Sequence, residues 1–228
     1  MLSVARKTAF MYCDSRKNIM GFEENNPNLY YTIKAQSRAE LKIKRSKFVA
    51  TAIPVKNKEE AMAALGTVRT EFHDARHNCF AYRFGNQGLE FRSSDDGEPS
   101  GSAGKPILFS LNKFDVSDLI VIVTRYFGGI KLGVGGLARA YSGAAELALA
   151  QSKKKAVHLT VPVKVFCTYE DVNVVKKLVI EHSISFEESY FDSVEYTAHI
   201  PKTKAEQFAE IISIATNARA GAVIQKES

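Results

Sequence analysis

The sequence predicts an α+β protein of two domains, the second with the β-α-β-β-α-β element order of a ferredoxin-like fold. Two observations carry this prediction. Segments in which apolar and polar residues alternate are interspersed with segments of helical periodicity along most of the chain. In addition, the chain has 228 residues, of which 45% are hydrophobic. At roughly 150 residues per domain, this length and composition suit one or two globular domains that each bury a core.

The first domain is expected to mix strands and helices. Runs of apolar and β-branched residues predict strands at Leu29–Ala35, Leu41–Val55, Cys79–Phe84, Leu89–Ser93 and Leu119–Phe127. Apolar residues at helical spacing predict helices at Lys58–Phe72, Ser102–Leu111 and Gly135–Ala150. The segment Gly85–Gly88 is typical of a hairpin loop. Pro106 fits the first turn of its helix, where a missing N–H group costs little.

The second domain has the clearer periodicities. Val157–Val165 alternates as a strand, and Glu170–His182 has helical spacing. Two strands, Ser183–Tyr190 and Val194–Ile200, then form a hairpin. A helix at Lys204–Ala215 and a short strand at Ala222–Gln225 complete the order.

Composition shifts mark the boundaries. Gln151–Ala156, which contains Ser-Lys-Lys-Lys, is predicted as a short basic linker, so the domains are residues 27–155 and 156–228. Residues 1–26 are an N-terminal extension and a candidate for disorder, in which Met20 is an alternative initiator. Residues 1–156 carry 24 Lys and Arg against 15 Asp and Glu, whereas residues 157–228 carry 7 against 10. The asymmetry favours a polyanionic partner for the first domain, although a solvated Lys-rich surface has the same composition.

The cysteines and histidines predict no metal, cofactor or catalytic group. Cys13, Cys79 and Cys167 are odd in number and far apart, which favours a reducing, cytoplasmic location. His73 and His77 lie near Cys79, but a zinc site needs about four ligands. We therefore interpret these three side chains as structural. No apolar run approaches the roughly 20 residues of a membrane span.

A glycine-rich segment, Thr124–Ser142, is the first candidate site. Between a strand and a helix it contains Gly128, Gly129, Gly133, Gly135 and Gly136. Glycines allow close backbone approach, and a helix N-terminus attracts anions. The basic side chains expected to assist in binding phosphate are Lys105, Arg125, Lys131 and Arg139. A tight structural turn, with its cations paired to nearby carboxylates, is the alternative.

An acidic segment, Ser93–Pro106, is the second candidate. It gathers Asp95, Asp96 and Glu98 beside glycines. Such a cluster can hold Mg²⁺ with a phosphate. More commonly its carboxylates cap backbone N–H groups and meet arginines, so we expect it to be an acidic partner of the basic residues.

Together these motifs resemble a known signature. The segments 77–83, SDDGEPSGSAGKPIL (94–108) and TRYFGGIKLGVGGLARAYS (124–142) are similar to the N-terminal domain of the IMPACT/YigZ family. Family members often read GTAGKP and KLGTGGL, whereas this chain has Ser102 and Val134. The resemblance implies a ribosomal protein S5 domain 2-like α/β sandwich, as in domain IV of elongation factor G. It also implies a ferredoxin-like second domain, as in domain V of that factor.

The resemblance favours a translation-associated protein that binds RNA or the ribosome, since those elongation factor domains meet RNA and eukaryotic relatives are linked to translation regulation. We predict binding rather than catalysis. Two alternatives stay open. One is a phosphate-ligand-binding protein or enzyme that uses the glycine-rich segment, and the other is a protein-interaction module.

Overall fold

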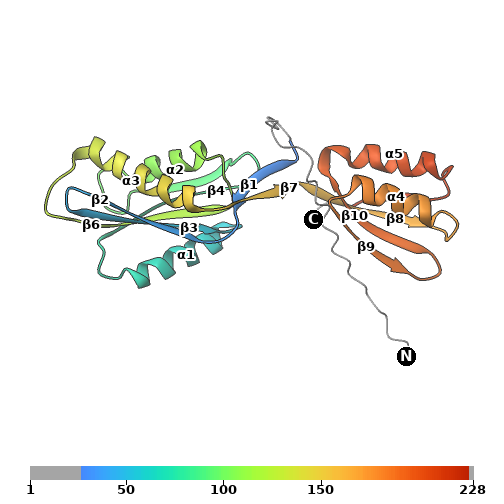
Figure 1. The fold of residues 1–228 in the computed structure, drawn as a ribbon, viewed down its shortest axis with the longest axis horizontal. Coiled ribbons are helices and arrows are strands. Elements are labelled where there is room, and N and C mark those ends of the chain that lie inside the picture. The colour runs from blue at the N-terminus through green and yellow to red at the C-terminus, as the bar shows by residue number, and fades with distance from the viewer. Residues whose placement is uncertain (1–26, 226–228) are drawn as a thin grey trace, which may run out of the picture. The chain divides into compact units, whose positions relative to one another are not determined.

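A computed structural model describes residues 27–225, which form two compact units (Figure 1). The first unit is the continuous segment Tyr30–Val157. The second combines residues 27–29 with the chain from His158 onward. The predicted extension at residues 1–26 lies outside the described residues. Between residues 27 and 225, no helix is long and apolar enough to span a membrane.

The first unit contains a five-stranded antiparallel sheet in the order β2-β3-β6-β4-β5. Its strands are β2 (Ser37–Ile43), β3 (Ser46–Pro54), β4 (His77–Phe84), β5 (Glu90–Ser94) and β6 (Leu119–Tyr126). The helices of the unit are α1 (Lys58–Glu71), α2 (Gly104–Lys113) and α3 (Gly133–Gln151). Apart from the segments 37–55 and 151–158, the elements of this unit lie where the sequence predicts them, within a few residues at either end.

Helices cover both faces of this sheet (Figure 1). On the central strand β6, Val121 and Val123 belong to a core shared with α2 and α3, whereas Ile120 and Ile122 face the core formed with α1. A strand that is buried on both faces needs apolar residues at every position. The uninterrupted run from Leu119 therefore predicts a buried strand, as observed.

The prediction of one long strand over Leu41–Val55 is wrong, because the chain reverses at Lys44 and Arg45. Ile43 pairs with Ser46, so β2 and β3 form a hairpin with a two-residue turn. Both turn residues have positive φ, 46° and 68°, as a type I′ turn requires. This turn usually contains Asn and Gly, so the sequence offers no turn signal here.

The predicted linker at Gln151–Ala156 is also different. Helix α3 continues to Gln151, and a strand β7 (Lys154–His158) begins two residues after Ser152. Strand β7 pairs with β1 (Leu29–Ile33) in a two-stranded sheet. The lysines stay exposed while their backbone pairs, which is why composition alone suggests a linker.

The second unit has the β-α-β-β-α-β order that the sequence predicts. Its elements are β8 (Thr160–Cys167), α4 (Val172–His182), β9 (Ser185–Tyr190), β10 (Val194–Pro201), α5 (Ala205–Ala215) and β11 (Gly221–Ile224), with a 3₁₀ turn, η1 (Lys202–Lys204), before α5. The antiparallel sheet has the order β11-β8-β10-β9, and both helices pack on one face (Figure 1). Asn28 is tied into this unit, since its side chain accepts a hydrogen bond from the Thr203 backbone N–H (3.1 Å).

Candidate functional site

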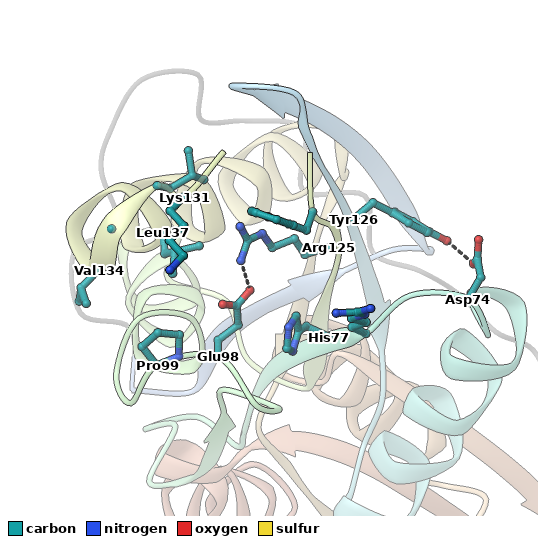
Figure 2. Close-up of a pocket in the computed structure, with 13 residues that line it drawn as sticks. Asp74, His77, Glu98, Pro99, Arg125, Tyr126, Lys131, Val134 and Leu137 are labelled. Carbon is teal, nitrogen blue, oxygen red and sulfur yellow. Dashed lines mark hydrogen bonds and ion pairs between the residues drawn. The ribbon is translucent and has the colours of Figure 1, made fainter. Parts of the chain in front are cut away.

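The two sequence motifs meet at one pocket of about 730 Å³ in the first unit (Figure 2). The pocket lies at the end of β6, between the start of α3 and the acidic segment. Its lining residues are Asp74, Arg76, His77, Glu98, Pro99, Arg125, Tyr126, Phe127, Lys131, Leu132, Gly133, Val134 and Leu137. Of the predicted residues, Glu98, Arg125, Lys131 and Gly133 line it.

A buried ion pair forms part of the pocket wall. Arg125 Nη1 lies 2.6 Å from Glu98 Oε1, and the two side chains are 7% and 4% exposed. The Tyr141 hydroxyl donates to the same oxygen at 2.7 Å, and burial raises its pKa, so it remains a donor. The sequence predicts that Arg125 binds phosphate, but its charge is balanced by Glu98. Its Nε is buried and has no hydrogen-bond partner among the described residues.

Asp95 organises the turn that leads into α2. Its carboxylate accepts hydrogen bonds from the backbone N–H groups of Gly101 (2.8 Å), Ala103 (2.9 Å) and Gly104 (2.8 Å). Burial alone would raise the pKa of Asp95, but these three donors outweigh it and hold the pKa below its usual value. Asp95 therefore caps backbone N–H groups at the start of α2, and its carboxylate does not line the pocket.

Asp96 and the residues around it also form hydrogen bonds within the fold. The Asp96 carboxylate accepts from the Asn78 N–H (2.7 Å) and from Arg69 (2.6 Å). Its carbonyl oxygen lies 2.8 Å from His77 Nδ1. Cys79 donates to the Asp95 carbonyl at 2.9 Å, and burial raises the pKa of this thiol to about 12. These contacts support the structural interpretation of the cysteine and of His77.

We expect the stability of the chain to depend on Asp95 in acid. Because its pKa is depressed in the folded state, the carboxylate stabilises the fold above the usual Asp pKa of 3.8, and this contribution is lost as the pH falls through the folded-state value. Asp95→Asn should lower the free energy of unfolding at pH 7 by about 2 kcal/mol. Urea denaturation from pH 7 to pH 2.5 should then show a smaller acid-induced loss for the variant. Exposed Asp115→Asn is the control, and parallel pH profiles for Asp95→Asn and the wild type would contradict the expectation.

Among the five glycines, Gly128 has the tightest surroundings. A Cβ atom on Gly128 would lie 2.0 Å from the carbonyl carbon of Arg45, and the Gly128 N–H donates to Ser46 Oγ at 3.2 Å. Gly128 therefore permits close contact with the β2–β3 turn. Gly129 and Gly133 have positive φ, 85° and 71°, which favours glycine.

Gly135 and Gly136 lie in the first turn of α3, outside the pocket lining. The predicted cations other than Arg125 also lie partly outside the pocket lining. Lys131 lines the pocket, whereas Arg139 on α3 and Lys105 on α2 do not. The predicted basic cluster is thus only partly gathered at the pocket.

The pocket includes residues that sequence analysis does not propose as ligand-binding. Arg76 is an exposed cation that lines the pocket, and neither Arg76 nor Lys131 has an ion-pair partner within residues 27–225. Phe127 is 55% exposed, and its ring centroid lies 5.4 Å from the Arg125 guanidinium. The strand register brings β4 to this place, since His77 pairs with Arg125 on β6. No local pattern identifies Arg76, because only this pairing places it there.

At the other end of the pocket, the Tyr126 hydroxyl donates to Asp74 Oδ1 at 2.7 Å (Figure 2). This bond holds the pKa of Asp74 below its usual value and raises the pKa of Tyr126 to about 12. Both carboxylates at the pocket, Asp74 and Glu98, thus have partners. What remains available to a ligand is an apolar surface bordered by the cations Arg76 and Lys131.

Comparison with known proteins identifies the family. The profile described as "Impact N-terminal domain" matches residues 44–149, which include both motifs. IMPACT family member YvyE of Bacillus subtilis is 31% identical over 196 residues, 83% of this chain and 88% of that protein. A Thermus thermophilus IMPACT family member is 39% identical over 160 residues, 70% of this chain and 86% of that protein. A crystal structure of a hypothetical protein, 29% identical, matches with a TM-score of 0.62 over 88% of this chain and 99% of its own. The chain therefore belongs to the IMPACT family.

Proposed function

We propose that this protein is a translation-associated RNA- or ribosome-binding protein of the cytoplasm that regulates translation, and that it binds RNA through its first unit. In this proposal the two units correspond to the ribosomal protein S5 domain 2-like and ferredoxin-like folds of elongation factor G domains IV and V. The order β11-β8-β10-β9 in the second sheet supports the ferredoxin-like assignment.

One observation carries the proposal: the basic β2–β3 turn packs directly against the glycine-rich segment. Gly128 packs against the Arg45 backbone, and Lys131 follows three residues later. Lys44, Arg45 and Lys131 are exposed, and none of them has an ion pair within the part of the chain that the structure describes. The unit Tyr30–Val157 contains 20 Lys and Arg against 12 Asp and Glu. Phosphate backbones bind such surfaces by releasing counterions.

The backbone of the turn supports a functional role for these two cations. A residue with a side chain in the left-handed region costs roughly 1–2 kcal/mol, and Lys44 and Arg45 both occupy it. Asn-Gly would form the same turn with less strain. Long basic side chains at these positions therefore reduce stability while they place two positive charges at the tip of a rigid hairpin.

We expect Lys44→Asn/Arg45→Gly to weaken RNA binding while raising the melting temperature, because the new turn removes both charges and relieves the strain. Binding to a single-stranded RNA by filter assay, and to ribosomes by co-sedimentation, would be measured across a salt series. Because the variant cannot neutralise two of the phosphates, the slope of log K against log salt should become less negative by about 1.4.

The control is Lys202→Gln/Lys204→Gln, which removes the same charge from the second unit. Equal binding by both double variants would show that net charge alone matters. Binding that is insensitive to salt in the wild-type protein would contradict the proposed function itself.

A further inference from the structure

We propose that the pocket binds a nucleoside monophosphate unit, with its base against Phe127 and its phosphate near Lys131 and the start of α3. If the unit is one unstacked nucleotide of an RNA strand, the inference rests on the proposed function and names what this site binds. If the unit is a free nucleotide, the same chemistry applies and the experiment below separates the two sources.

The pocket has the size and surface that such a ligand requires. Its volume of about 730 Å³ lies within the roughly 300–1,000 Å³ of small-molecule sites. Phe127 and Val134 line it and are 55% and 58% exposed, so two apolar side chains face solvent at the pocket. A planar base would cover this surface, and stacking of a base on an aromatic ring is worth roughly 1–3 kcal/mol.

The charges favour a phosphate beside Lys131, at the start of α3. Glu98 is paired with Arg125, and Asp74 accepts from Tyr126, so both nearby carboxylates are engaged. Lys131 and Arg76 have no ion pair within residues 27–225 and line the same pocket. The 19-residue helix α3 begins at Gly133, and no side chain within the described residues caps its first N–H groups. Free N–H groups at a helix start attract phosphate.

An unsatisfied donor points to a ligand as well. Arg125 is 7% exposed and lines the pocket, and its Nε has no hydrogen-bond partner among the described residues. Leaving a buried donor unpaired costs roughly 1–3 kcal/mol. Because the donor is itself buried, an acceptor atom of a bound base or sugar would satisfy it after a small shift of the side chains around the guanidinium.

The test is calorimetric titration of the full chain with AMP, GMP, CMP, UMP and inorganic phosphate. Saturable binding of one or more of the nucleotides is expected, with inorganic phosphate weaker. Phe127→Ala should weaken nucleotide binding about ten- to a hundredfold, as expected for the loss of one stacked base, and Phe127→Tyr should restore it. Lys131→Gln should weaken the binding of both the nucleotides and inorganic phosphate. Phe109→Ala, which removes an aromatic ring on α2 that is 64% exposed, is the control and should change neither.

Titration of a single-stranded RNA hexamer separates the sources. If Phe127→Ala weakens RNA binding too, the unit belongs to an RNA strand; if it affects mononucleotides alone, the ligand is a free nucleotide. Either result supports the inference. Nucleotide and phosphate affinities that are equal and unaffected by Phe127→Ala would overturn it. The proposed function would still stand if RNA binding remained sensitive to Lys44→Asn/Arg45→Gly.

Discussion

Arg125→Met is expected to lower the free energy of unfolding by about 3–5 kcal/mol. The substitution leaves Glu98 without its counterion in a place where its side chain is 4% exposed. The Tyr141 hydroxyl then stabilises the carboxylate with only one hydrogen bond. Urea denaturation followed by circular dichroism would measure the loss, and the pocket wall should lose its defined shape.

Two further variants make this expectation specific. Lys113→Met breaks an exposed pair with Glu146, whose side chains are 54% and 30% exposed, and should cost less than about 1 kcal/mol. Arg125→Met/Glu98→Leu removes both buried charges and should recover most of the stability that Arg125→Met loses. If Arg125→Met and Lys113→Met lower the free energy of unfolding by the same amount, the buried ion pair does not contribute more to stability than the exposed one.

Gly128→Ala is expected to destabilise the first unit by about 3 kcal/mol, a large effect for one methyl group. The added Cβ would meet the carbonyl carbon of Arg45 at 2.0 Å and the Ser46 nitrogen at 2.4 Å. These are backbone atoms, so the β2–β3 turn must move away from the glycine-rich segment. RNA affinity should fall together with stability, because the two parts of the basic surface separate.

Gly135→Ala is the matched control for this experiment. Its Cβ would meet nothing closer than Arg139 Nη1 at 3.6 Å, and its φ is negative as a helix requires. Alanine there should raise stability by about 0.5 kcal/mol, since it reduces the entropy of the unfolded chain. Thermal unfolding of both variants would test the difference. Similar melting temperatures for the two variants would show that the close approach of the backbone to Gly128 does not determine stability.

Most of the fold follows from local patterns, and the exceptions have a common cause. The strand from Leu119 and the hairpin loop at Gly85–Gly88 are determined by residues within each segment, so local sequence patterns predict them. The turn at Lys44 and Arg45 is stabilised by contact with Gly128, more than 80 residues away. Strand β7 likewise depends on pairing with β1. No local pattern records such contacts.

The site shows the same division. Sequence motifs identify both segments that meet at the pocket, but they cannot tell that Arg125 is paired with Glu98 while Lys131 has no ion pair among the described residues. The two residues differ because Arg125 is buried on a central strand, whereas Lys131 lies in an exposed loop. Arg76 enters the site through the register of β4 on β6.

The division of the chain between units also sets an order of events during synthesis. Tyr30–Val157 is continuous, so the first unit can fold as soon as it has left the ribosome. The second unit needs Asn28, made early, and Thr203, made 175 positions later. Its earliest residues must therefore wait for that contact until Thr203 has been made. Premature termination after β7 should release a folded first unit that could already bind its ligand, without the second unit.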